Sequence, residues 1–569
     1  MTTHNPATQA NSETPAETSL VAGEPMFQDQ TIAALAEHEG NAAAWKAAFT
    51  QHGAAAPAGV SGDFSVALVL PDGAAQMAVD RFAVRSLCYR IEGGRLLYAE
   101  RAVDLVGANP EIDPQALFDY LHFHVIPSPR TIFKGVFRLP PAHRATFRDG
   151  LLELAPYWVP AFVESRAASF GSLRDEFRQS LADSVRRQLD GKRTGCFLSG
   201  GTDSSTVAGM LGQVTGAPAQ TFSIGFDAEG YDEMEFSRIA ARHFGAEHHE
   251  YYITPADLVE SVPKVAASYD QPFGNSSVLP AYYCAKVARE AGIERMLGGD
   301  GGDELFGGNS RYAKQRVFGV YDQLPDLLRN GVLQPLLGDN PLARALPGVR
   351  KAASYVNQAR VPMPDRMHTY NLLQRLGIDT VLTADFLAQV DIGEPLAHQR
   401  AVYANCTAKS LVNRMLAYDW RYTLAETDIP KVVGATALAG VSVGFPLLDQ
   451  QLVDFSMRLP PHYKVNRLKL RWFFKEALRG FLPDQIITKK KQGFGLPFGV
   501  WATRDAALMA LARDSLGSLG TRGLVRADFL AALIEHHLPE HPGYYGEMVW
   551  ILMMLEQWLQ AHAPNYRVA

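Results

Sequence analysis

The chain of 569 residues is long enough for about three or four domains of ordinary size. Its 47% hydrophobic and 20% charged residues are typical of a globular protein, and 54 basic against 60 acidic residues give a formal net charge of -6. Nucleic acids and anionic membranes attract clustered positive charge, so this balance argues against either as the main partner. The sequence has no run of about 18 apolar residues and no signal-peptide pattern, and its four cysteines are widely spaced. We therefore expect a cytoplasmic protein with reduced thiols.

The first part of the chain divides into a tail and a β-rich domain. Residues 1–25 are rich in Thr, Asn, Pro and Ala and poor in large apolar side chains, which predicts a disordered tail. Residues 26–165 form the first predicted domain. Between residues 60 and 106, short alternating apolar and polar runs are separated by Asp-Gly and Gly-Gly turns, a pattern typical of an antiparallel sheet.

Residues 170–569 read as an α/β domain. Apolar strand-like runs at 195–201, 221–226 and 294–298 alternate with helical runs at 173–189, 203–214, 237–245 and 281–292. This alternation predicts βαβ units and a parallel sheet. The segment 315–425 is mostly helical in pattern, and residues 549–559 predict a terminal helix packed on the core.

A glycine-rich stretch, FLSGGTDSS (197–205), follows the first of these strands. A strand that ends in Ser-Gly-Gly and turns into a helix points unpaired backbone N–H groups and the positive end of the helix at one place. The glycines let the backbone approach an anion closely. Asp203 and Ser204 stand at the helix start, where a carboxylate either caps the helix or holds Mg²⁺. Taken alone, the turn is equally consistent with a structural cap and with a phosphate-binding loop.

A second glycine-rich stretch, LGGDGGDELFGG (297–308), carries the acids Asp300, Asp303 and Glu304. Hard cations such as Mg²⁺ take oxygen ligands and usually keep substrate phosphate oxygens as well. Both glycine-rich loops lie at the carboxyl ends of predicted parallel strands, where open α/β sheets bind their ligands. The chain has no GxxxxGK[ST] motif, so these loops are not a Walker-type phosphate site.

These motifs resemble the PP-loop ATP pyrophosphatases and, among them, the asparagine synthetase family. The resemblance runs from about Asp175 to Trp501 through FLSGGTDSS, TFSIGFDAEGYDE, DQPFGNSS, MLGGDGGDELFGG, IPKVVGATALAGVSVGFPLLD and KKKQGFGLPFGVW. It implies a parallel-sheet domain of the adenine nucleotide α-hydrolase type. It also implies a carbon–nitrogen ligase that uses ATP and Mg²⁺, activates a carboxylate as an acyl-adenylate with release of pyrophosphate, and completes the amide by amine attack.

The resemblance also implies roles for individual residues. The ATP and pyrophosphate site would comprise Leu198, Ser199, Gly200, Gly201, Asp203, Ser204, Ser223, Ile224 and Gly299, and Asp203 and Asp303 would hold Mg²⁺. Lys491, Lys431 and Asp300 would be catalytic, with Lys491 stabilising the charge that develops during adenylation. Asp270 and Ser276 would contact the substrate.

The N-terminal domain departs from the glutamine-using members of the family. Those members begin with Cys directly after the initiator Met, whereas this chain begins MTTH, and their early glutamine-binding segments are absent. Only later features match, in GDFSVALV, DRFAVRSLCY and TIFKGVFRLPPAH. We therefore expect a truncated Ntn-type glutamine amidotransferase-like domain, antiparallel and β-rich, that does not hydrolyse glutamine.

A second departure lies near the expected substrate site. Val433, Gly434, Ser442 and Gly444 replace positions that are commonly charged in the family. An ammonia-dependent asparagine synthetase and a peptide or β-lactam-type cyclase therefore both remain open, as does an inactive nucleotide-binding partner of another enzyme. The retained Asp203, Asp303 and Lys491 disfavour the inactive partner. The carboxylate, the amine or ammonia donor, and the choice among monomer, homodimer and partner protein stay undetermined.

Overall fold

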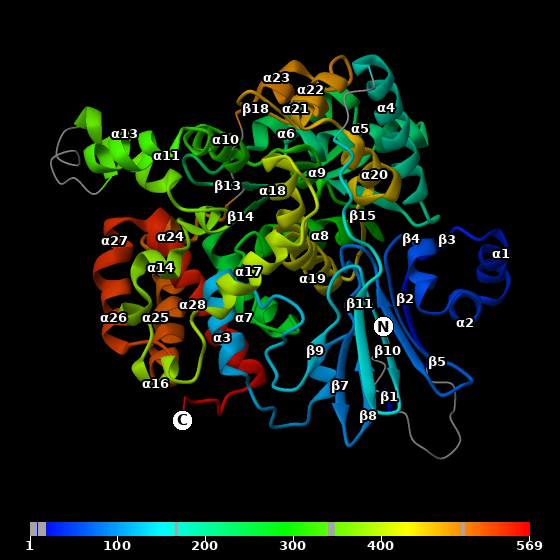
Figure 1. Ribbon diagram of the computed structural model, residues 1–569, viewed down its shortest axis with the longest axis horizontal. Helices are drawn as coiled ribbons and strands as arrows, with labels where there is room; N and C mark the ends of the chain where they lie inside the picture. Colours follow the sequence, from blue (N-terminus) through cyan, green and yellow to red (C-terminus); the bar gives the residue numbers. More distant parts are fainter. Residues whose placement is uncertain (1–7, 10–18, 165–168, 339–346, 491–494, 569) are drawn as a thin grey trace.

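The computed structural model describes residues 8–9, 19–164, 169–338, 347–490 and 495–568. Its N-terminal domain of strands lies beside a larger α/β part, and the C-terminal helices lie next to helix α3 (Pro114–Phe123) (Figure 1). The Tyr120 hydroxyl on α3 donates a hydrogen bond of 2.8 Å to the Ile551 carbonyl of the last helix. The two parts of the chain are therefore packed directly against each other.

Two antiparallel sheets form the N-terminal domain, which confirms the predicted antiparallel architecture. Their strand orders are β1-β8-β7-β9 and β11-β10-β6-β5-β2. The bounds are β1 Thr8–Gln9, β2 Leu20–Gly23, β5 Phe64–Val69, β6 Ala75–Val79, β7 Cys88–Glu92, β8 Arg95–Ala99, β9 Phe137–Arg138, β10 His143–Arg148 and β11 Leu151–Pro156. Helices α1 (Gln30–Glu39) and α2 (Asn41–His52) cover a core around Trp45 and Phe49.

The expectation of a disordered tail up to residue 25 is wrong for Leu20–Gly23. These residues form β2 and pair with β5, with Val21 opposite Val66. Val21 packs on the core around Trp45, so burial of its apolar side chain helps to hold this strand on the domain.

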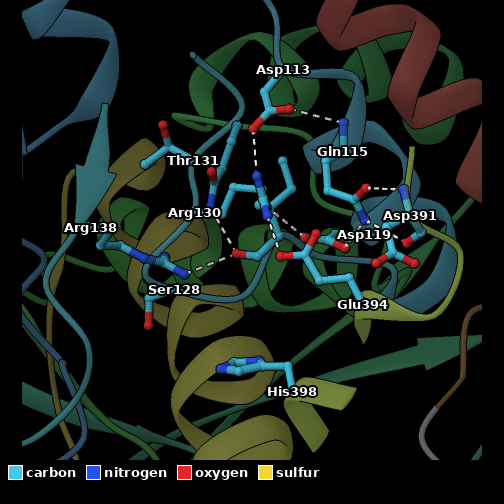
Figure 2. A network of polar contacts seen from close by, with 12 residues as sticks. Asp113, Gln115, Asp119, Ser128, Arg130, Thr131, Arg138, Asp391, Glu394 and His398 are labelled. Carbon is cyan, nitrogen blue, oxygen red and sulfur yellow. Dashed lines mark hydrogen bonds and ion pairs between the residues drawn. The ribbon is translucent and has the colours of Figure 1, made fainter. Parts of the chain in front are cut away.

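A polar network joins the N-terminal domain to the helical part of the α/β domain (Figure 2). Arg130 pairs with Asp113 at 2.8 Å and Asp119 at 3.1 Å in its own domain, and with Glu394 at 2.6 Å. Glu394 is the first residue of α17 (Glu394–Ala404). One guanidinium therefore joins three carboxylates across the interface, in the geometry for which arginine is suited.

Five parallel strands form the central sheet, in the order β14-β13-β12-β15-β16. Their bounds are β12 Thr194–Phe197, β13 Gln220–Phe226, β14 Glu247–Ile253, β15 Arg295–Leu297 and β16 Ser442–Gly444. The chain moves from β12 outward to β13 and β14, then returns to the other side of β12 with β15. The carboxyl ends of β12 and β15 therefore flank the point where the strand order reverses, which is the usual ligand crevice of such sheets.

Four helices at the sheet confirm helical runs predicted from the sequence: α4 Phe170–Arg187, α5 Thr202–Thr215, α6 Met234–Phe244 and α8 Val278–Glu290. Helices α7 Pro255–Ser268, α19 Ile429–Ala439 and α20 Gln450–Arg458, which were not predicted, also lie near the sheet. Further helices of eight or more residues include α10 Ser310–Asp322, α13 Pro347–Ala359, α18 Leu411–Asp419, α25 Ala506–Gly520 and α28 Pro542–His562. Short helices include α9 Gly302–Phe306, α11 Asp326–Leu328, α14 Leu372–Leu376, α15 Ile378–Val381, α16 Ala384–Leu387, α21 Pro461–Lys464, α22 Trp472–Ala477, α23 Asp484–Thr488, α24 Phe498–Ala502, α26 Ala527–Ala532 and α27 Leu538–Glu540. The mostly helical character predicted for 315–425 is confirmed for the described residues 315–338 and 347–425.

The terminal helix α28 contains the predicted 549–559 segment and is buried in the main core, with Trp550 and Trp558 almost fully covered. A buried ion pair fixes its second half. Arg522 Nε donates to Glu556 Oε2 at 2.6 Å, and Nη2 donates to Oε1 at 3.0 Å. Arg522 Nη1 also donates to the carbonyls of residues just after the helix, including Tyr566 at 3.0 Å.

Replacing Glu556 by Ala should lower the free energy of unfolding by about 3 to 5 kcal/mol, because it leaves the buried Arg522 charge without its carboxylate. Urea denaturation followed by tryptophan fluorescence measures the change. Glu540→Ala, at an exposed position, is the matched control and should stay within about 0.5 kcal/mol of the parent. Equal effects of the two substitutions would show that the buried pair does not anchor α28.

Candidate functional site

The turn after β12 brings the backbone of residues 198–201 to the start of α5. Gly200 has φ +66°, and a Cβ at this position would lie 2.5 Å from the Ser237 backbone nitrogen of α6. Glycine is therefore required both for the backbone angle and for the close packing. Ser199 N donates to Ser204 Oγ at 3.1 Å, which closes the loop over the helix start. The backbone N–H groups in the first turn of α5 face this loop, which is the arrangement that an anion site requires.

The acidic loop after β15 packs against this turn. A Cβ on Gly299 would lie 2.8 Å from the Ser204 nitrogen, and a Cβ on Gly302 would lie 2.4 Å from the Asp203 carboxylate. Glycines at both positions thus let the two loops approach each other at the point where β12 and β15 end. This approach places Asp203 next to the loop that carries Asp303.

Arg471 lies between the two carboxylates that were predicted to hold Mg²⁺. Its side chain is 9% exposed; Nη1 binds Asp203, and Nη2 lies 3.0 Å from Asp303 Oδ1. Burial opposes the charge of Arg471, but both carboxylates outweigh it and raise the pKa of the guanidinium. Because the two carboxylates already converge on one cationic group, their oxygens fit a shared Mg²⁺ ion as ligands. Arg471 was missed by the sequence reasoning, since it stands far along the chain in no recognised motif.

A second charged cluster surrounds Lys431, on α19. Its Nζ lies 3.1 Å from Asp428 Oδ1 and 3.6 Å from Asp300 Oδ1. Burial acts against the lysine charge, but Asp428 and Asp300 raise its pKa above the ordinary value, so it stays protonated at neutral pH. Burial raises the pKa of Asp300, an effect that Lys431 only partly offsets. Asp428 was also missed by the sequence reasoning.

One cavity of about 380 Å³ unites these groups, a volume within the range of small-molecule sites. Ten of the residues expected to be functional line it: Leu198, Ser199, Asp203, Ser204, Ser223, Ile224, Gly299, Asp300, Asp303 and Lys431. Gly200 and Gly201 form the adjoining turn. An apolar wall that the sequence reasoning did not identify consists of Phe197, Phe222, Pro280, Ala281, Cys284 and Val432. Among the described lining residues Lys431 is the only lysine or arginine, against five acids.

Asp270 and Ser276, which were expected at the site, do not line this cavity. The Asp270 carboxylate is turned away from the cavity and accepts hydrogen bonds from Ala102 N at 2.7 Å and Val103 N at 3.0 Å in the N-terminal domain. Ser276 lines a neighbouring cavity, whereas Asn275 and Ser277 on either side of it line the one just described. Lys491 lies outside the described residues.

Lys489 is not part of an exposed lysine run. Its Nζ lies 2.9 Å from Glu233 Oε1, with the two side chains 8% and 10% exposed, and it lies over the Phe236 ring at 4.3 Å. Glu233 precedes α6, and Ser237 on α6 donates a hydrogen bond to the Leu198 carbonyl, beside the Ser199–Gly201 turn. Lys489 is therefore not suitable as a neutral surface control for Lys491, whereas Lys490 is exposed.

Comparison with known proteins assigns both parts of the chain. A family model described as asparagine synthase matches residues 176–560, and one described as a glutamine amidotransferase domain matches residues 41–158. The first match spans more than half of the chain. The chain belongs to the asparagine synthase family. As a member of this family it is an ATP-dependent ligase that joins a carboxylate substrate and an amine donor in an amide, and its fold is the predicted pairing of an antiparallel amidotransferase-like domain with a parallel-sheet synthase domain.

Individual relatives in this family are distant. The chain is 23% identical over 485 residues to glutamine-hydrolyzing asparagine synthetase 1 of Bacillus subtilis (strain 168), covering 84% of this chain and 74% of that protein. It is 23% identical over 475 residues to the amidase chry2 of Gibberella zeae, covering 74% of this chain and 68% of that protein. Among the residues described for this family member, no helix combines the length and apolar character needed to span a bilayer.

Replacing Gly299 by Ala should weaken ATP binding about tenfold or more, because the added methyl would press on the Ser204 backbone and separate the two glycine-rich loops. Equilibrium dialysis with labelled ATP measures the dissociation constant. Gly517→Ala is the control, since a Cβ there meets nothing within 4 Å in the middle of α25. If the Gly299 variant bound ATP as tightly as the Gly517 variant, the loops would not form the nucleotide site.

Proposed function

We propose that this chain activates a carboxylate as an acyl-adenylate, releases pyrophosphate from ATP, and forms the amide by amine attack without hydrolysing glutamine itself. The observation that carries the proposal is the single cavity in which the Ser-Gly-Gly turn, the acidic loop and Lys431 meet. The chemistry needs positioning and charge compensation more than a covalent enzyme intermediate.

The cavity offers a distinct place for each part of ATP. Phe222, Ile224 and the apolar residues of α8 form a slot suited to adenine, and the Ser223 segment provides backbone groups beside it. The β and γ phosphates would lie at the Ser199–Gly201 turn and the start of α5, where backbone N–H groups stabilise negative charge. Asp203 and Asp303 would hold Mg²⁺, which when bound neutralises charge on the departing pyrophosphate.

Lys431 and Lys491 are the proposed cations for the reacting centre. In the adenylation step a carboxylate oxygen of the substrate attacks the α phosphorus, and the bond to the bridging oxygen of pyrophosphate breaks. Lys431 keeps its charge beside Asp300 and Asp428 and is placed to stabilise the phosphate side of this step. The role of Lys491 is proposed from the KKKQGFGLPFGVW motif, in which Lys489 pairs with Glu233 just before α6.

The amidotransferase-like domain has no candidate thiol for glutamine hydrolysis in the matched residues 41–158. Cys88 is the one cysteine there, and it is fully buried in β7. Burial raises its pKa, so the reactive thiolate is suppressed. This supports a structural role for the domain.

The charges of the nucleotide cavity favour a substrate that carries no second carboxylate. Lys431 already lies between Asp300 and Asp428, and Arg471 between Asp203 and Asp303, so neither of these cations is available to a second carboxylate such as that of aspartate. The neutral positions noted in the sequence agree with this. The space beside Gly434 is filled by Tyr269, and Gly444 abuts Gln188 and Arg295. We therefore propose a carboxylate whose remaining part is neutral or cationic.

With a suitable carboxylate and amine, turnover should yield AMP and pyrophosphate in equal amounts. Ion-exchange chromatography of the nucleotides together with a pyrophosphate assay measures the products. Formation of ADP and phosphate in their place would contradict adenylation.

Glutamine should not be hydrolysed by the purified chain at a rate comparable to ligase turnover, because the only thiol of the matched domain is buried and protonated. A coupled glutamate dehydrogenase assay detects the product. Glutamate release at ligase-like rates, lost in Cys88→Ser, would show that this domain is an active glutaminase.

Lys491→Ala should lower the rate about a hundredfold or more, which corresponds to about 2.7 kcal/mol of transition-state stabilisation, while ATP affinity changes little. Pyrophosphate release under saturating ATP measures the rate. Lys490→Ala is the matched control, since Lys490 is exposed. Similar small losses in the two variants would remove Lys491 from the mechanism.

A further inference from the structure

A second cavity of about 360 Å³ adjoins the nucleotide cavity at the interface of the two domains. Asn275 lines both cavities, Ser276 and Thr427 line the second, and their neighbours Ser277 and Asp428 line the first. The 275–277 loop and residues 427–428, at the end of a helical segment, therefore border both spaces.

The amidotransferase-like domain supplies part of the wall of this second cavity. Phe123 and His124, at the end of α3, line it together with residues of α28. His124 is the C-cap of α3 and has φ +65°, the left-handed angle in which helices commonly end. Its carbonyl accepts a hydrogen bond of 2.8 Å from Gly274 N, next to Asn275. The end of α3 is thereby held against the loop that borders both cavities.

The polar groups of the second cavity select for positive charge. Glu547 lines it and is 61% exposed, and no lysine or arginine occurs among the described residues of the lining. The nearest imidazole, His124, lies 3.9 Å from Glu547. Burial lowers the pKa of His124 to about 4, so at neutral pH the imidazole is uncharged and does not compensate Glu547, whose own pKa is raised by burial.

Aromatic rings form much of the remaining wall. Phe123, Tyr231, Phe498 and Trp550 line the cavity, and such rings favour apolar and cationic groups. An aromatic ligand that carries a cationic group therefore fits both the rings and the Glu547 carboxylate.

We propose that this cavity binds the amine donor of the ligase reaction, an aromatic primary amine that binds as its ammonium form. That the ligand is the amine donor rests on the proposed function. The chemical class of the ligand rests on the residues that line the cavity. It also gives the amidotransferase-like domain a role, because that domain forms part of the amine site.

In the amide-forming step the ammonium loses one proton, its nitrogen forms the C–N bond to the acyl carbon, and the C–O bond to AMP breaks with the electron pair leaving on AMP. A second proton is lost as the amide forms. Asp300 and Asp428, which line the nucleotide cavity, are the carboxylates that can accept these protons on their way to solvent.

Ligand-observed NMR titration of the full chain tests the proposal with two probes of matched ring, L-phenylalaninamide as a cation and N-acetyl-L-phenylalanine as an anion. We expect the cation to bind at least tenfold more tightly. Glu547→Gln should abolish this preference, Glu547→Asp should keep most of it, and Glu540→Gln, an exposed control on α27, should leave it unchanged.

Tighter or equal binding of the anion, absence of binding of the cation, or a preference that survives Glu547→Gln would each overturn the proposal. The titration uses neither ATP nor a carboxylate substrate. Failure of the chain to release pyrophosphate would therefore contradict the proposed function alone, while failure of the titration would contradict the amine site alone.

Discussion

The guanidinium of Arg471 compensates the charges of two carboxylates and so allows the two glycine-rich loops to pack together. Asp203 and Asp303 arise from different loops and would repel each other in a buried place, yet both approach the same arginine. An arginine that is itself buried needs carboxylates to compensate its charge, so the three groups stabilise one another. Gly299 and Gly302 make the approach sterically feasible, because any side chain there would meet the opposite loop. The charge and the two glycines together create the floor of the nucleotide cavity.

Elements of both domains surround the nucleotide cavity above this floor. The reversal of strand order between β12 and β15 brings the loops to one crevice, and α19 adds Lys431 with Asp428 from the other side. The amidotransferase-like domain reaches this region through α3, and Asp270 of the synthase domain binds the backbone of residues 102–103 in return. The Arg130 network reinforces the same interface. A domain without an accessible thiol can thus be retained because it shapes the space next to the nucleotide.

The sequence predicted what local chemistry determines. A strand followed by Ser-Gly-Gly and a helix is a local pattern, so Ser199, Gly200 and Ser204 could be expected at one edge of the sheet, and the glycine-rich acidic loop brought Asp303 there in the same way. Their binding roles were named from the family resemblance. Arg471 and Asp428 could not be named, because their roles depend on partners far along the chain. Asp270 shows the opposite error, since a motif does not say which way its side chain points. Leu20–Gly23 shows that a polar composition does not prevent a short apolar run from joining a sheet edge.

We propose that the carboxylates of Asp203 and Asp303 are a preformed pair of ligands for the metal that accompanies ATP. A crystal structure with Mn²⁺ and an ATP analogue that cannot be cleaved between the α and β phosphates tests it most directly, because the anomalous signal of manganese locates the ion. We predict an ion within about 2.3 Å of an oxygen from each carboxylate and in contact with phosphate oxygens at the Ser199–Gly201 turn. An ion bound elsewhere, with both carboxylates still paired to Arg471, would contradict the claim.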